Sequence, residues 1–240
     1  MLILPIITFL CWGSFLNVCA YRIIMGGSLW SRSACPHCAT HIAWYDLIPV
    51  ISWLALNGKC RSCKQPISIL YPFIELLTAV TCTALLATTY PSYFLSYFIL
   101  TTALLITIRT DMEFMLIPRL CSIYLVPVGV GLSSMYLLPI SWAESVCGAL
   151  CGYIILAAIA YFYKKRTGVT GMGDGDPELL AGIGSFIGVN GVWYTLLIGS
   201  LSASAYALCL IGLHKASSES KIPFGPFLAF GALISLFFMK

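Results

Sequence analysis

The sequence predicts an all-α membrane protein, a bundle of about eight transmembrane helices with one long loop outside the membrane. Hydrophobic residues make up 60% and charged residues 9% of the 240 residues, whereas soluble domains carry about 25% charge. Apolar runs recur along the chain at lengths near the roughly 20 residues that cross a bilayer. The net charge of +4 is too small to indicate a nucleic-acid partner, so membrane lipid is the partner that composition implies.

Eight apolar runs are candidate spans. The first is read as a transmembrane helix rather than a cleavable signal, because no small-residue cleavage site follows it. The sixth is too short, since its 14 residues rise only about 21 Å across a hydrocarbon core of roughly 30 Å. The predicted spans are 2–22, 70–90, 93–110, 117–138, 143–163, 177–190, 192–213 and 223–239.

This pattern divides the chain into a first transmembrane helix at 1–22, a loop at 23–69 and a transmembrane bundle at 70–240 that we expect to be catalytic. If the amino terminus lies outside, every Lys and Arg except Lys240 falls on the cytoplasmic side, as the positive-inside rule requires. Lys215 and Lys221 are among these cytoplasmic residues. The long loop is then cytoplasmic.

The loop holds two Cys-x-x-Cys turns separated by 21 residues. Each turn presents two sulfurs, and four thiolates around one tetrahedral ion are typical of a structural zinc site. Four reduced thiols without a metal are the alternative, whereas disulfides are disfavoured because the cytoplasm keeps thiols reduced. The predicted zinc ligands are Cys35, Cys38, Cys60 and Cys63.

Between the two knuckles, the segments 44–49 and 52–54 mix aromatic and aliphatic residues. Neither reaches spanning length. We expect both to lie at the membrane interface, where Trp and Tyr are enriched.

Two acids lie where apolar runs end or begin. Asp111 follows the run 93–110, and Asp176 closes the glycine-rich stretch 173–176. Ionisable groups at membrane depth are costly and indicate function. The predicted topology places both on the cytoplasmic side, so they can share a site. Pro177 suits the first turn of a helix, which makes Asp176 the expected N-cap.

Two aspartates close together in a low-dielectric site share one proton and titrate as a unit. Such a pair can polarise water with its carboxylate and protonate a leaving amine with its acid, which is peptide hydrolysis without a covalent intermediate. A zinc-stabilised transporter or assembly factor that uses the aspartates as a proton relay is the alternative. If the two aspartates have only structural roles, Asp176 caps a helix and Asp111 is an interfacial charge near Arg109.

Several further motifs, spread in order along nearly the whole chain, resemble those of a known protein family. Together with the cysteine knuckles, they resemble the type IV prepilin peptidases, the bacterial inner-membrane leader peptidases and N-methyltransferases of pilus and type II secretion systems. The matching segments are 13–18 with Arg22, 44–49, 52–53, 71–72, 75–77, Asp111 with Ile117 and Pro118, 173–176, and 223–227.

The resemblance implies an intramembrane aspartyl protease with Asp111 and Asp176 as its catalytic residues, while Asp174 falls on the variable position of the Gly-x-Gly-Asp motif. The implied substrate is a type IV prepilin or pseudopilin, cleaved after a short basic leader on the cytoplasmic side of the inner membrane. The long cysteine loop favours the two-activity form, in which S-adenosylmethionine methylates the new amino terminus. Family members commonly carry lysine where this chain has Glu178.

Overall fold

The computed structural model describes residues 3–213 and 222–238, and the regular secondary structure within these ranges is helical apart from two isolated β-bridges. The predicted all-α class is therefore confirmed. The chain forms two compact units, Met1–Ala87 and Thr88–Lys240. Three residues used in the topology prediction, Lys215, Lys221 and Lys240, lie outside the described residues.

The first unit is built on two long apolar helices joined by the cysteine loop. The helices meet at Gly13, where a β-carbon would lie 2.8 Å from the Glu75 Cα atom. Beside this contact, the Asn17 amide donates a hydrogen bond to the Tyr71 carbonyl at 3.1 Å. The elements are α1 (Ile3–Met25), η1 (Trp44–Leu47), α2 (Ile51–Ala55) and α3 (Leu70–Thr88).

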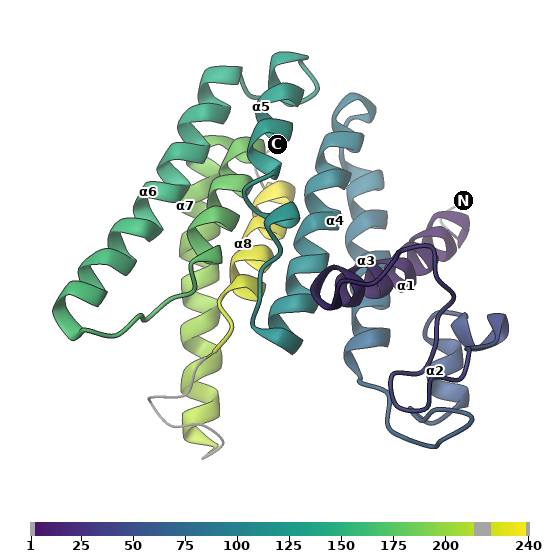
Figure 1. The fold of residues 1–240 in the computed structure, drawn as a ribbon. Helices are drawn as coiled ribbons and strands as arrows, with labels where there is room; N and C mark the ends of the chain where they lie inside the picture. The colour runs from purple at the N-terminus through teal and green to yellow at the C-terminus, as the bar shows by residue number, and fades with distance from the viewer. Residues whose placement is uncertain (1–2, 214–221, 239–240) are drawn as a thin grey trace. The chain divides into compact units, whose positions relative to one another are not determined.

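In the second unit, α7 packs against both α6 and α8, and α4 packs against α8 (Figure 1). Ser141 begins α6 with a capping box, in which its hydroxyl accepts from the Glu144 amide and the Glu144 carboxylate accepts from the Ser141 amide. The elements are α4 (Pro91–Phe114), η2 (Arg119–Cys121), α5 (Leu125–Ser134), α6 (Trp142–Thr167), α7 (Gly175–Gly212) and α8 (Gly225–Phe238).

Helix α7 is two helices joined at Gly188, whose φ of 70° and ψ of −176° are not helical. A β-carbon on Gly184 would lie 2.8 Å from a Val192 methyl group. In one continuous helix these two residues would be about 12 Å apart along the axis, so the chain reverses direction here. Glycine suits this position because a positive φ costs other residues steric strain.

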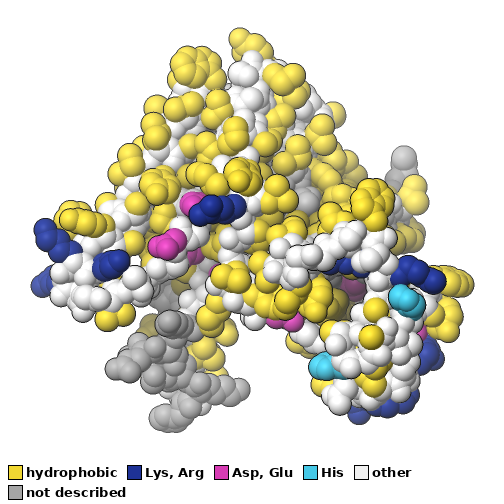
Figure 2. Space-filling view, viewed as in Figure 1, with side chains coloured by type: hydrophobic (Ala, Val, Ile, Leu, Met, Phe, Trp, Pro, Cys, Tyr) yellow, Lys and Arg dark blue, Asp and Glu magenta, His cyan; other side chains and the backbone are white. Residues whose placement is uncertain are grey.

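Among the described residues, five helices are long and apolar enough to cross a membrane: α1, α3, α4, α6 and α7. Hydrophobic side chains cover much of the visible surface of α5 and α6 (Figure 2), as expected for helices that face lipid. The predicted count of eight spans is not confirmed. The run predicted at 117–138 is broken into η2 and α5, and α8 has only 14 residues. The two runs predicted at 177–190 and 192–213 correspond to the two halves of α7, which are separated at Gly188.

Glycines allow α6 and α7 to pack with their backbones in contact. A β-carbon on Gly148 would overlap the Gly184 carbonyl oxygen and would lie 2.9 Å from the backbone of Gly188. One turn further along α6, a β-carbon on Gly152 would lie 2.6 Å from the Leu180 carbonyl oxygen. Close approach of backbones at small residues is a general way in which membrane helices associate.

We expect Gly148→Val to destabilise the second unit by about 1–3 kcal/mol or more, because overpacking cannot be relieved where the neighbour is backbone. The measurement is the thermal unfolding midpoint of the purified protein in detergent. Gly131→Ala is the matched control, since a β-carbon at that helical position meets nothing within 4 Å. An unchanged midpoint for Gly148→Val would contradict the close α6–α7 contact.

Candidate active site

The second unit brings Asp111 and Asp176 together. Asp111 lies in the last turn of α4 and Asp176 in the first turn of α7, and each residue is only 5% exposed. The two carboxylates are close enough to interact electrostatically. Buried acids are costly unless they are paired or hydrogen-bonded, so the backbone around each carboxylate decides whether the pair is tolerated.

The beginning of α8 supplies the hydrogen-bond donor for Asp111. The Gly225 amide donates to Asp111 Oδ2 at 3.0 Å. A β-carbon on Gly225 would lie 2.7 Å from the same oxygen, so only glycine brings its amide this close without displacing the carboxylate. The first amides of a helix also favour nearby negative charge, and α8 therefore both orients Asp111 and stabilises its ionised form.

The glycine-rich turn before α7 supplies the donor for Asp176. The Gly173 amide donates to Asp176 Oδ2 at 3.2 Å. The expectation that Asp176 is the N-cap is wrong, because α7 begins at Gly175 and Asp174 occupies the cap position without a side-chain hydrogen bond. The Asp176 amide already bonds to the Gly173 carbonyl at 3.3 Å. This turn starts the helix earlier and directs the Asp176 carboxylate back toward Gly173.

Ile117 packs against the backbone beside both acids. A β-carbon on Gly175 would lie 3.0 Å from Ile117 Cβ, and one on Gly225 would lie 3.2 Å from Ile117 Cδ1. One apolar side chain thus contacts the entry to α7 and the entry to α8. The two glycines leave the space that this side chain needs.

Two further acids near the pair have polar partners. Glu113 forms an ion pair with Arg109, which lies one turn before it in α4. The Ser122 hydroxyl donates to Glu178 Oε2 at 3.3 Å. Glu178, the residue that departs from the family pattern, is therefore held by the segment between η2 and α5. Asp174 is exposed.

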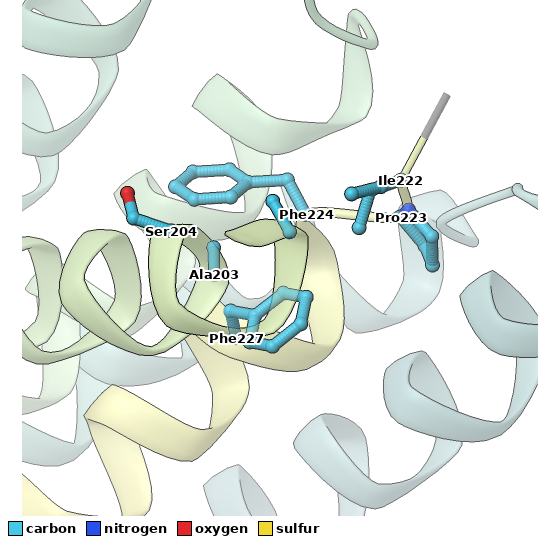
Figure 3. Close-up of a pocket in the computed structure, with 7 residues that line it drawn as sticks. Ala203, Ser204, Ile222, Pro223, Phe224 and Phe227 are labelled. Carbon is cyan, nitrogen blue, oxygen red and sulfur yellow. The ribbon is translucent and has the colours of Figure 1, made fainter. Parts of the chain in front are cut away.

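An apolar cavity of about 250 Å³ lies between α7 and the beginning of α8 (Figure 3). Phe224 and Phe227, which flank Gly225 in the sequence, line it together with Ile222 and Pro223. Residues Ala203, Ser204 and Ala207 of α7 complete the lining. These side chains include no acid, base or thiol, so the cavity itself is not the reaction centre.

In the first unit, the four predicted zinc ligands form one cluster. The sulfur atoms of Cys35, Cys38, Cys60 and Cys63 all lie within 4.8 Å of one another, and those of Cys35 and Cys63 are 3.8 Å apart. Four sulfurs around one zinc ion, with Zn–S bonds of about 2.3 Å in tetrahedral geometry, are separated by about 3.8 Å. The donor set and its spacing fit a structural metal ion.

The two knuckles have the same backbone design. The residue after each second cysteine has a positive φ, 55° at Ala39 and 59° at Lys64. The amides of these residues donate to the carbonyls of Cys35 and Cys60, at 2.9 and 3.0 Å. Two equivalent turns of this kind present their sulfurs to one point, as a shared metal ion needs.

Hydrogen bonds favour the thiolate form at two of these cysteines. Hydrogen bonding with Thr40 lowers the pKa of Cys38 to about 6. Backbone hydrogen bonds from Cys63 and Ser62 lower the pKa of Cys60. Since the thiolate is the metal ligand, these contacts favour metal binding.

An ion pair braces the same loop. Arg61 in the second knuckle binds both carboxylate oxygens of Asp46 in η1, at 2.7 and 2.8 Å. This contact lowers the pKa of Asp46. Lys, Arg and His side chains are visible over the knuckle loop in Figure 2.

Sequence reasoning missed the two glycine amides that hold the aspartates. Gly173 belongs to a motif whose acids point to chemistry, and Gly225 is one residue of the segment 223–227 that shares the family resemblance. A glycine between two prolines, in Pro223–Pro226, is a signal that the backbone must approach something closely. The sequence could not show that the approached group is Asp111, because 114 residues separate the two.

The fold and the site define a helical membrane protein that carries two interacting aspartates within its bundle. Comparison with known protein families matches both parts of the chain to families of peptidases. Residues 7–89 match the bacterial peptidase A24 N-terminal domain, and residues 98–208 match the type IV leader peptidase family. Comparison with solved structures found no match.

Similar curated proteins are prepilin leader peptidase/N-methyltransferases. The one from Aeromonas hydrophila is 37% identical over 206 residues, which cover 85% of this chain and 71% of the relative. The one from Burkholderia pseudomallei (strain 1026b) is 33% identical and covers 94% of this chain and 82% of the relative. The one from Pseudomonas aeruginosa is 34% identical over 212 residues.

The chain belongs to the type IV leader peptidase family, which is a family of proteases. The resemblance drawn from the sequence motifs is thereby confirmed, and the protein is a membrane-embedded enzyme.

We expect Gly225→Ala to lower kcat for peptide cleavage by about 100-fold, since a displacement near 1 Å at a reacting group has effects of this size. The added methyl group would displace the Asp111 carboxylate while leaving surfaces distant from it intact, so KM should change little. The measurement is steady-state cleavage kinetics in detergent micelles. Gly212→Ala is the control, because a β-carbon there meets nothing within 4 Å. A KM effect with unchanged kcat would contradict a role for Gly225 in orienting Asp111.

Proposed function

We propose that the protein is an aspartyl endopeptidase that removes the basic leader of type IV prepilins or pseudopilins, with Asp111 and Asp176 as its catalytic pair. The observation that supports this most is the burial of two interacting carboxylates, each held by a glycine amide from a different turn. The relatives' names supply the substrate class. The family match supplies the reaction class, peptide hydrolysis.

In the proposed reaction, the ionised aspartate takes a proton from a water molecule, and the water oxygen attacks the scissile carbonyl carbon. The protonated aspartate then gives its proton to the amide nitrogen as the carbon–nitrogen bond breaks. The products are a new carboxylate and a new amino terminus, without a covalent intermediate. The glycine amides occupy one oxygen of each aspartate, which leaves the other oxygen of each for water and substrate.

We place the enzyme in the bacterial inner membrane, with the aspartate pair near the cytoplasmic surface. The five apolar helices support a membrane location. The charge distribution of the sequence supports the orientation, because Lys164, Lys165 and Arg166 all lie in the last turn of α6. Positive residues at a helix end mark the cytoplasmic side.

Two further groups belong to the proposal. A zinc ion held by the thiolates of Cys35, Cys38, Cys60 and Cys63 would join the two knuckles and stabilise the loop. S-adenosylmethionine would donate a methyl group to the new amino terminus, which the relatives' names support. The sequence shows no recognisable methyl-donor motif, so no residue of this chain is assigned to that step.

We expect Asp111→Asn and Asp176→Asn each to lower cleavage of a leader-bearing prepilin by at least about 1,000-fold, since each removes a group that transfers a proton. Mass spectrometry of the product's amino terminus reports the cleavage site and any methyl group together. Asp174→Asn is the matched control, because Asp174 lies beside the pair but is exposed. A transporter would leave the leader uncut in the native protein as well.

We expect Cys35→Ser with Cys60→Ser to abolish stoichiometric zinc in the purified protein, because each knuckle loses one of its two thiolates. The measurement is elemental analysis of the protein after gel filtration. Methylation should fall more than cleavage if the loop serves mainly the second activity. Cys147→Ser is the control, since this cysteine is exposed in α6. Native protein that contains no zinc, or variants that retain it, would contradict the metal site.

A further inference from the structure

The segment from η1 to α2 in the first unit has an exposed apolar edge. Its exposed large hydrophobic side chains include four with exposed fractions between 40 and 78%. Two of them precede the short helix α2 and two lie within it. All four belong to the loop that also carries the predicted metal ligands. These side chains, the η1–α2 edge, are Trp44, Ile48, Ile51 and Leu54.

The opposite face of α2 is packed against its own loop. The Trp53 indole N–H donates to the Ile67 carbonyl at 3.1 Å, and a β-carbon on Gly58 would lie 2.8 Å from the Trp53 ring. Ile51 and Leu54 are three residues apart and so share a helix face. Helix α2 therefore has one apolar side that is packed and another that is exposed.

A buried carboxylate ties this segment to α3. The Val50 amide, immediately before α2, donates to Glu75 Oε2 at 2.8 Å. Val50 has a φ of 61°, which is unusual for a β-branched residue. Such a conformation persists only where surrounding contacts enforce it. Glu75 is 6% exposed, and its contact with Val50 is a fixed attachment point.

The attachment point lies inside the length of a spanning helix. The 19 residues of α3 rise about 28 Å, close to the roughly 30 Å of the hydrocarbon core. Glu75 is the sixth residue of α3, so it lies about 8 Å from the beginning of the helix. The start of α2 is therefore held within about 8 Å of the level where headgroups give way to acyl chains.

We propose that the η1–α2 edge is a lipid-binding anchor that inserts into the phospholipid at the membrane surface where α3 begins. Apolar faces of interfacial helices penetrate about 5–10 Å into this boundary, which agrees with the depth at which Glu75 holds Val50. Phe73, Leu76 and Val80 of α3 are exposed as well, as expected for a helix that faces lipid. The anchor fixes the metal-binding loop to the bilayer, a role separate from peptide cleavage.

The test places a photoreactive amino acid, p-benzoylphenylalanine, at Ile51 or Leu54 of the full chain. The protein is reconstituted in nanodiscs of phosphatidylethanolamine and phosphatidylglycerol, irradiated and analysed by mass spectrometry for phospholipid adducts. Ser62, exposed in the second knuckle, is the matched control position. We expect roughly tenfold more lipid adduct at 51 and 54 than at 62, because only the first two positions are inserted.

Equal adduct yields at all three positions would overturn the proposal. So would a lack of adduct at 51 and 54, or crosslinks there to a second protein chain instead of lipid. The unmodified protein gives an independent reading by hydroxyl-radical labelling in nanodiscs. Ile51 and Leu54 should be shielded relative to His37, which is exposed in the first knuckle. Labelling of Ile51 and Leu54 at the level of their exposed fractions would also overturn it.

The attachment through Glu75 has its own readout. Glu75→Gln keeps an oxygen that accepts the Val50 amide, whereas Glu75→Ala removes it. The lipid adduct at position 51 should fall several-fold in Glu75→Ala and be retained in Glu75→Gln. If both variants give the native yield, Glu75 does not set the depth of the anchor.

Discussion

The need to hydrogen-bond two buried carboxylates shapes the second unit. Asp111 and Asp176 have little contact with water, and in such surroundings a polar group without a partner is costly. The protein meets this need with backbone amides from Gly173 and Gly225 rather than with basic side chains. An amide satisfies a carboxylate without neutralising it, as the proposed sharing of one proton by the pair requires. The beginnings of α7 and α8 therefore have to meet the end of α4.

This arrangement explains the position of glycines at the site. Gly175 and Gly225 make room for Ile117, and Gly225 also makes room for the Asp111 carboxylate. Glycines further from the site serve packing instead, as where Gly148 meets Gly184 between α6 and α7. The same residue type thus acts in two ways, one local to the chemistry and one that holds the supporting helices together.

Much of this organisation could be predicted from the sequence, because it depends on patterns between residues that are close together in the chain. Apolar runs indicate the long helices, and Cys-x-x-Cys spacing indicates that the sulfurs of Cys35 and Cys63 belong to one cluster. The predicted topology allowed Asp111 and Asp176 to meet, but other contacts between distant segments could not be predicted. Hydropathy separated the runs 177–190 and 192–213, which places a reversal within three residues of Gly188, but it did not show that α5 is shortened. The partner of Asp111 depends on how α8 packs, and the N-cap of α7 depends on a turn whose hydrogen bonds composition does not reveal.

The reversal at Gly188 has a consequence for the distant carboxylates. It lies 13 residues after Gly175, about 20 Å along the helix, toward the other end of the bundle. The returning half of α7 supports α8, since a β-carbon on Gly199 would lie 3.0 Å from the Phe227 carbonyl oxygen. The height at which the chain turns back therefore sets the height of Gly225 beside Asp111. Sequence changes near Gly188 are therefore expected to slide α8 along its neighbour and to move the Gly225 amide relative to Asp111, without touching either acid.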